Sequence, residues 1–188
     1  MKQLSPASPH VIVMVGIPGA GKSAFARHFS ETFKSPWVNQ FFLQREYGLT
    51  LEQAKPVALG LLDELLKGRK TIIFEGSTET EDDRSALYTK ITKAGYKALV
   101  VWVQTDSIEA RRRASKPHPL GSQLTDDEFN EIIDIFQPPV EKERAVVISG
   151  RHTHPSQLKI VLRHLAVSRP RVRIPSRPHV VKPRTVRE

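Results

Sequence analysis

The sequence predicts a three-layer α/β domain, in which helices cover both faces of a mostly parallel sheet. Four apolar runs of strand length (11–15, 71–75, 98–103 and 145–148) alternate with segments that have helical periodicity. The first run, Val-Ile-Val-Met-Val, is apolar at every position, which is typical of a strand that is covered on both faces. Because strands that alternate with helices are joined by right-handed crossovers, we expect neighbouring strands to be parallel.

The composition is typical of a soluble globular protein, with 39% hydrophobic and 26% charged residues in a chain of 188. The chain contains no cysteine, which excludes disulfides, thiolate zinc sites and cysteine nucleophiles. Its apolar runs have the length of strands, whereas a membrane-spanning helix needs roughly 20 apolar residues. Residues 1–10 do not resemble a signal peptide, so we expect a cytoplasmic protein.

The net charge of +9 is concentrated at the end of the chain. Residues 168–188 hold seven basic residues and one acidic residue, so this tail carries +6 and the remaining residues carry only +3. Four prolines lie among its arginines, which predicts a disordered or extended tail. The tail is either solvated without a role or a contact for nucleic acid or an acidic partner. We therefore expect a flexible leader over 1–9, a domain over 10–167 and a basic tail over 168–188.

A glycine-rich stretch follows the first apolar run directly. Residues 16–23 read Gly-Ile-Pro-Gly-Ala-Gly-Lys-Ser and match the pattern G-x-x-x-x-G-K-[ST], between a predicted strand and a predicted helix. Its glycines let successive N–H groups turn toward an anion at the positive end of that helix. Lys22 would reach the β- and γ-phosphates of ATP, and the Ser23 hydroxyl would bind Mg²⁺. The pattern predicts a P-loop NTPase fold whose nucleotide-binding residues are Gly16, Ile17, Pro18, Gly19, Ala20, Gly21, Lys22, Ser23 and Ala24.

The segments between the apolar runs carry helix signals. Phe25 and Phe29 are spaced for one helix face, which predicts a helix over about 22–33. Thr50 opens a capping box and predicts a helix to about residue 67, which Pro56 would either start or kink. Residues 35–49 have no clear period and could form a strand end or the wall of a pocket. Further helices are predicted from Thr80 to before Gly95, from Thr105 or Asp106 through 113, from Thr125 to about 136, and over 156–166.

Three further positions could contribute to phosphate chemistry. Glu75 ends the second apolar run and would hold the metal, unless it is a solvent-exposed glutamate at a strand end. Arg113 and Lys116 are three positions apart on the short helix, directly before a loop with two prolines and a glycine over 114–124. They are either cations of a lid over about 111–124 or a solvated basic helix end.

Beyond these residues, the chain resembles the P-loop kinases of the polynucleotide 5′-hydroxyl kinase and zeta-toxin group, within the broad AAA group of ATP-binding proteins. The resemblance rests on residues 16–23, on Glu-Gly-Ser-Thr at 75–78, on Arg84, on the arginines at 111–113 and on 136–143, and it spans about residues 10–165. It implies that Glu75 stands where the group usually has aspartate, that Arg84 positions substrate or phosphate, and that Arg113 and Lys116 are the lid cations.

One position departs from that group. Its members often carry an aspartate eight residues before a glycine, and this aspartate accepts the proton of the substrate hydroxyl. Counting back from Gly48 gives Gln40, and an amide cannot act as a base. Because the transition state of phosphoryl transfer is loose, loss of the base need not abolish transfer. A different substrate, another carboxylate such as Glu46, and a role other than a kinase all stay open.

The sequence therefore predicts an ATP- and Mg²⁺-dependent phosphotransferase that moves the γ-phosphate to a hydroxyl group of a nucleic-acid end or a small molecule. The alternative is a nucleotide-binding switch or NTPase module whose basic tail binds RNA or an acidic partner. The two differ in their dependence on residues 168–188, because a small-molecule kinase needs no polyanion contact.

Overall fold

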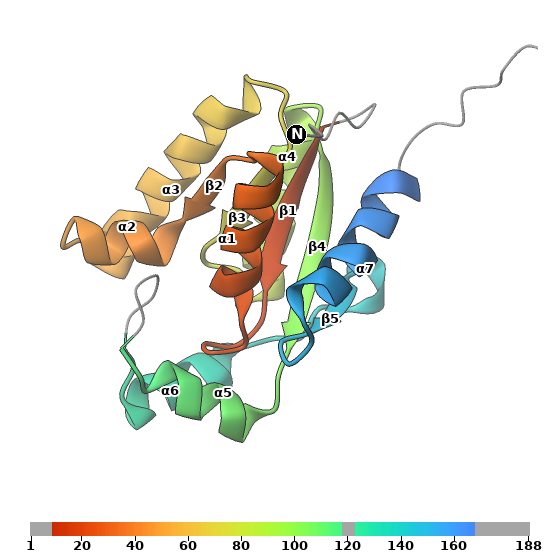
Figure 1. The fold of residues 1–188 in the computed structure, drawn as a ribbon. Helices are drawn as coiled ribbons and strands as arrows, with labels where there is room; N and C mark the ends of the chain where they lie inside the picture. The colour runs from red at the N-terminus through yellow and green to blue at the C-terminus, as the bar shows by residue number, and fades with distance from the viewer. Residues whose placement is uncertain (1–8, 118–122, 168–188) are drawn as a thin grey trace, which may run out of the picture.

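The fold was obtained as a computed structural model that describes residues 9–117 and 123–167. Residues 1–8 of the predicted leader, the predicted tail and the middle of the predicted lid lie outside these residues. The described chain forms a five-stranded sheet with the order β2-β3-β1-β4-β5, in which every neighbouring pair is parallel (Figure 1). The strands are β1 (His10–Val15), β2 (Trp37–Asn39), β3 (Ile72–Glu75), β4 (Lys97–Gln104) and β5 (Val146–Ser149).

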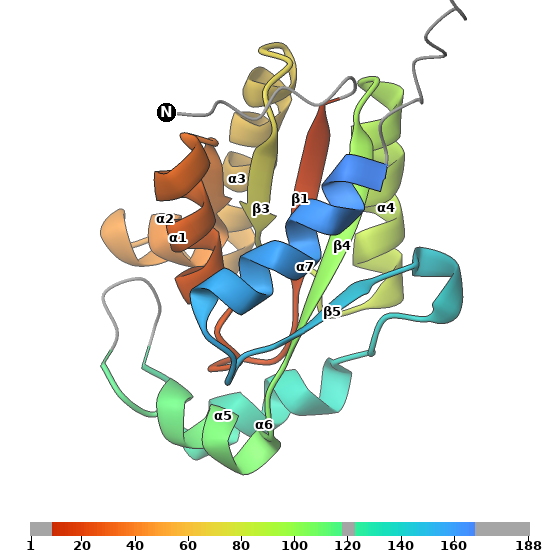
Figure 2. The ribbon, with the colours of Figure 1, turned by 45° about the vertical axis from the view of Figure 1, so that its right-hand side comes forward.

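Helices cover both faces of this sheet, as predicted. The helices α3 and α4 pack on one face, and α1 and α7 pack on the other (Figure 2). The helices α5 and α6 lie beyond the carboxyl ends of β1 and β4, on the same side as the loop that follows β1 (Figure 1). The helices are α1 (Lys22–Phe33), α2 (Gln40–Glu46), α3 (Leu51–Leu66), α4 (Glu81–Lys93), α5 (Ser107–Ala114), α6 (Asp126–Ile135), the 3-10 helix η1 (Glu141–Glu143) and α7 (His154–Val167).

The central strand β1 is buried at every position, which is why its sequence is apolar throughout. Its alternate side chains Val11, Val13 and Val15 face the cluster that includes Leu62 of α3 and Leu87 of α4. Its other side chains, Ile12 and Met14, face the cluster formed with Phe25 and Phe29 of α1 and with Val161 of α7. The strand therefore joins the two halves of the core, and it ends at the glycine-rich loop.

The capping signals set the helix boundaries. The Gln53 N–H donates to Thr50 Oγ1 at 3.2 Å, and the Thr50 N–H donates to Gln53 Oε1 at 2.9 Å. With this capping box in place, α3 begins at Leu51 and continues through Pro56, so the alternative start at Pro56 is wrong. The stretch that lacked a clear period, 35–49, forms the short edge strand β2 and the helix α2. In the described ranges, no helix combines the length and the apolar composition that crossing a membrane requires.

Adjacent leucines of α3 test this packing. Leu62 is fully buried in the core, whereas Leu61 is 44% exposed. We expect Leu62→Ala to lower the free energy of unfolding by about 2–5 kcal/mol, because it removes packed atoms and leaves a cavity. We expect Leu61→Ala to cost less than about 1 kcal/mol. Urea denaturation of both variants measures the difference, and equal losses would contradict the position of α3.

Candidate phosphate-binding site

The loop between β1 and α1 takes the conformation that its glycines allow. Gly16, Gly19 and Gly21 have φ angles of 144°, 74° and 108°, which residues other than glycine rarely adopt. The Ala20 N–H donates to the Ile17 carbonyl at 3.2 Å and closes the turn, and Gly21 caps α1. The loop therefore lies at the N-terminus of α1, where the helix dipole favours an anion.

Two of the loop's contacts leave no space for a side chain. A β-carbon at Gly19 would lie 2.0 Å from the Ala110 carbonyl oxygen of α5, and one at Gly150 would lie 1.9 Å from the Ala20 carbonyl oxygen. The Thr105 hydroxyl donates to the same Ala20 oxygen at 2.8 Å. The loop is thus held against α5 and against the segment that leaves β5, so α5 forms one wall of the site.

Lys22 curls back over its own loop. Its Nζ donates to the Gly16 carbonyl at 2.6 Å and to the Ile17 carbonyl at 3.1 Å. Burial lowers the pKa of Lys22, while the charges of Glu75 and Glu79 act in the opposite direction. The ammonium group can exchange two carbonyl oxygens for the oxygens of a phosphate without moving far.

The first turn of α1 touches the end of β3. The Ser23 hydroxyl donates to Glu75 Oε1 at 2.6 Å, and Glu75 is only 1% exposed, so it is not a solvent-exposed glutamate. Burial raises the pKa of Glu75, and the Lys22 charge, the Ser23 hydroxyl and the Trp37 indole oppose this rise. Among the described residues, Glu75 Oε2 has no hydrogen bond of regular geometry. The structure therefore brings Lys22, Ser23 and Glu75 together, and their hydroxyl and carboxylate oxygens are ligands that suit Mg²⁺.

The basic end of α5 is internally paired. Arg113 Nε donates to Glu109 Oε1 at 2.7 Å, and Arg113 Nη1 donates to the Gly150 carbonyl at 3.1 Å. Hydrogen bonds from Arg112 and Arg113 lower the pKa of Glu109 to about 2. Lys116 does not share a helix with Arg113, because α5 ends at Ala114. Pro117 accounts for this early end, since a residue before proline avoids helical angles.

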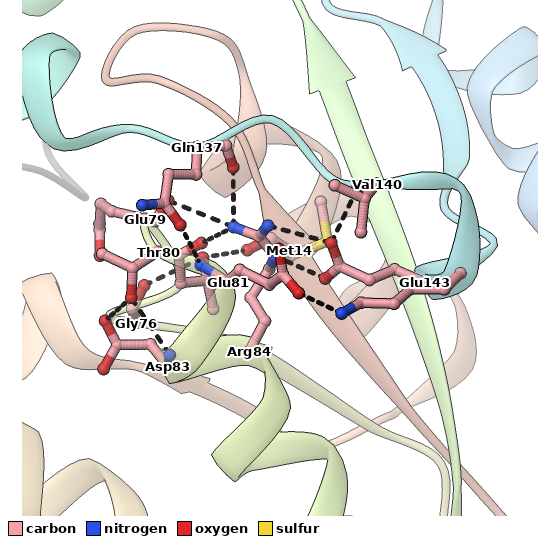
Figure 3. Close-up of polar contacts among 12 residues, drawn as sticks. Met14, Gly76, Glu79, Thr80, Glu81, Asp83, Arg84, Gln137, Val140 and Glu143 are labelled. Carbon is pink, nitrogen blue, oxygen red and sulfur yellow. Dashed lines mark hydrogen bonds and ion pairs between the residues drawn. The ribbon is translucent and has the colours of Figure 1, made fainter.

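Arg84 is not a helix-surface residue. Its side chain is 1% exposed and makes five hydrogen bonds, all to protein atoms (Figure 3). Nε and Nη2 donate to the two carboxylate oxygens of Glu143 at 2.6 and 3.0 Å. Nη1 donates to the carbonyls of Thr78, Glu79 and Gln137 at 3.0, 3.2 and 2.9 Å. We call this arrangement the Arg84 clasp, because it joins the loop after β3 to the segment between α6 and β5.

The residue at the position expected for the base, Gln40, also forms its hydrogen bonds within the protein. Gln40 is 1% exposed, its Oε1 accepts the Ser77 N–H at 2.9 Å, and its Nε2 donates to Ser77 Oγ at 3.1 Å. A β-carbon at Gly76 would lie 2.8 Å from Gln40 Oε1, so glycine is needed there for this contact. The other carboxylate that the sequence offered, Glu46, is exposed at the end of α2, with its Oε2 3.9 Å from Arg45.

Sequence reasoning missed one acidic residue of the site. Glu79 is half-buried in the loop after β3, and its charge, after that of Glu75, opposes the lowering of the Lys22 pKa by burial. Its four-residue distance from Glu75 is the only sequence signal, and such a spacing is common in polar loops.

The comparisons with known proteins bear on the fold. No family model matches the chain, and no curated protein matches its sequence. A gluconokinase from Sinorhizobium meliloti has a similar structure, with a TM-score of 0.62 and 18% identity over 85% of this chain and 93% of the gluconokinase. A sugar kinase from Janibacter sp. aligns with a TM-score of 0.61 and 18% identity over 86% of this chain and 96% of that protein. The predicted three-layer P-loop fold is thereby confirmed, in the form found in these kinases.

The Arg84 clasp makes a prediction about stability. We expect Arg84→Met to lower the free energy of unfolding by about 3–5 kcal/mol, because three carbonyl oxygens lose their donor and Glu143, whose side chain is 12% exposed, loses its cationic partner. The matched control is Lys67→Met, which breaks an ion pair with Glu64 in which both side chains are 70% exposed. That change should cost at most about 1 kcal/mol.

The cost of Arg84→Met should also depend on pH. Burial raises the pKa of Glu143, but hydrogen bonds from Arg84 and the Val140 N–H outweigh it, so the pKa lies below its ordinary value of 4.5. A lowered carboxyl pKa contributes stability that is present above the unfolded value and is lost as the pH falls through the folded value. The difference between wild type and Arg84→Met should therefore shrink below pH 4.5 in urea titrations. A constant difference across this range would show that Glu143 charge is not involved.

Proposed function

We propose that this chain is an ATP-dependent kinase that transfers the γ-phosphate of ATP to a hydroxyl group of a small molecule. The observation that carries the proposal is the contact between Ser23 Oγ and Glu75 Oε1 beside the ammonium group of Lys22. These are the charge and the oxygen ligands that phosphoryl transfer requires. The similarity of the fold to a gluconokinase and a sugar kinase supports the same reaction type.

Each residue has a role in this proposal. The backbone of residues 16–24 surrounds the phosphates and donates from its N–H groups, of which Pro18 has none, and Lys22 binds the β- and γ-phosphate oxygens in place of its own loop carbonyls. Ser23 and Glu75 would hold Mg²⁺, which neutralises charge on the phosphate oxygens when it is bound. Arg113, on the helix that contacts Gly19, would exchange Glu109 for the transferring phosphate when the lid closes. Arg84 acts through its clasp, and Lys116 follows α5 as a second cation of the lid.

Two observations favour a small acceptor. The first 167 residues carry a net charge of only +3, which is low for a surface that binds a nucleic-acid backbone. A cavity of about 150 Å³ lies between α3 and α4, where apolar side chains of Leu59, Phe74 and Leu87 and polar groups of Gln40, Lys55, Ser77 and Asp83 line it. Apolar walls with a few polar groups are the usual lining of a small-molecule site. A nucleic-acid 5′ end, which the resemblance implies as acceptor, is the competing choice.

Transfer of labelled γ-phosphate from ATP tests the proposal. Sugars, sugar acids, polyols and a 5′-hydroxyl oligonucleotide serve as acceptors. We expect label on one small acceptor, and a loss of roughly 100-fold or more with Lys22→Ala, because the lysine stabilises developing charge. Lys93→Ala, an exposed change on α4, is the matched control and should retain activity. Label on the oligonucleotide alone would overturn the small acceptor, and release of free phosphate alone would overturn the kinase.

A nucleotide-binding switch or NTPase module is the alternative, and the charge of +6 on residues 168–188 favours it. Deletion of these residues separates the two functions. A small-molecule kinase should keep its kcat and its ATP affinity after deletion. A module that binds RNA or an acidic partner through the tail should lose that binding together with its salt dependence, as measured by titration at two salt concentrations.

A further inference from the structure

The proposed reaction releases a proton from the acceptor hydroxyl, and the residue expected to receive it is absent. Gln40 is an amide bound to Ser77, and Glu75 is bound to Ser23. A carboxylate that receives the proton must lie near the phosphate loop and must be free to contact a ligand. Among the described residues, Glu79 meets both conditions.

The main chain of Glu79 is held beside the phosphate loop. Its carbonyl oxygen accepts hydrogen bonds from Arg84 Nη1 at 3.2 Å and from the Gln137 N–H at 2.9 Å (Figure 3). The preceding residue, Thr78, donates from its hydroxyl to the Met14 carbonyl at 2.9 Å. Met14 lies two positions before Gly16 on β1. Because consecutive Cα atoms are about 3.8 Å apart, Glu79 stands one residue from an anchor at the entrance of the loop.

The side chain of Glu79 has no partner within the described ranges. Of its acidic neighbours on α4, Glu81 pairs with Lys142 and Asp83 with Lys55 at 2.7 Å, while Asp82 is exposed to solvent. Glu79 makes neither an ion pair nor a side-chain hydrogen bond there, although it is half-buried. A half-buried carboxylate that is unpaired within the described ranges, on a main chain anchored at the end of β1, is placed to contact a ligand bound at the phosphate loop.

We propose that Glu79 is a catalytic residue whose carboxylate accepts the proton of the acceptor hydroxyl. The inference rests on the proposed function. In the step, the acceptor oxygen forms a bond to the γ-phosphorus while the bond from that phosphorus to the β,γ-bridging oxygen breaks. The electron pair of the broken bond stays on ADP, and the hydroxyl proton passes to a carboxylate oxygen of Glu79. The Arg84 clasp then has a functional reason, since it fixes the main chain from which this carboxylate projects.

Glu79→Gln in the full chain tests the proposal, with the small acceptor that gives most label in the transfer assay. We expect kcat to fall about 100-fold, because a positioned base contributes at least that factor. The affinity for ATP, measured by calorimetry, should stay within about twofold of wild type, which corresponds to little change in binding free energy. Glu81→Gln is the matched control, because its carboxylate pairs with Lys142, and it should keep wild-type kcat.

A second readout separates a base from a merely structural carboxylate. With an acceptor analogue whose hydroxyl is made more acidic by a neighbouring fluorine, the loss caused by Glu79→Gln should be smaller, since less proton transfer is required. An unchanged kcat in Glu79→Gln, or a fall matched by an equal loss of ATP affinity, would overturn the role of Glu79. Absence of transfer by the wild-type chain would instead overturn the proposed function, so the two failures are distinguishable.

Discussion

A guanidinium group that is 1% exposed must find its counter-charge and its hydrogen-bond acceptors inside the protein, and Arg84 finds them in two separate loops. Glu143 supplies the charge, and carbonyl oxygens of Thr78, Glu79 and Gln137 take the remaining N–H groups. Removal of Glu143 would leave the charge of Arg84 unpaired in the interior, which destabilises a protein strongly. The loop after β3, which begins directly after Glu75, is therefore fixed relative to the segment that follows α6.

The other side of the site is fixed by packing rather than by charge. The phosphate loop lies so close to α5 and to Gly150 that no β-carbon fits at Gly19 or at Gly150 itself. Close packing of this kind is rigid, because interiors lack free volume into which a neighbour could move. The loop that would bind phosphates is thus held against α5 and Gly150, and the arginines of α5 lie on a helix in direct contact with it. Rigid placement of this sort is what a reaction that depends on positioning requires.

Two acidic residues, one at the end of β3 and one in the loop that follows, have different surroundings. Glu75 is buried against Ser23, and burial raises its pKa, whereas Glu79 is half-buried and unpaired within the described chain. Groups of the same chemical type in different environments can serve different roles, here a metal ligand and a proton acceptor. The substitution of an amide for a carboxylate at Gln40 is consistent with this division, because the amide holds Ser77 through both its donor and its acceptor atoms.

The sequence by itself determined the elements whose cause is local. An apolar run predicts a buried strand, a capping box marks the start of a helix, and the pattern of residues 16–23 specifies a phosphate loop, since each depends on neighbours in the chain. Only the tertiary structure decided the roles of Arg84, Gln40 and Glu79. Arg84 and Glu143 are 59 positions apart, and Gln40 and Ser77 are 37 apart. Such pairs meet because the strands are ordered β2-β3-β1-β4-β5, and no local preference of the chain specifies that order.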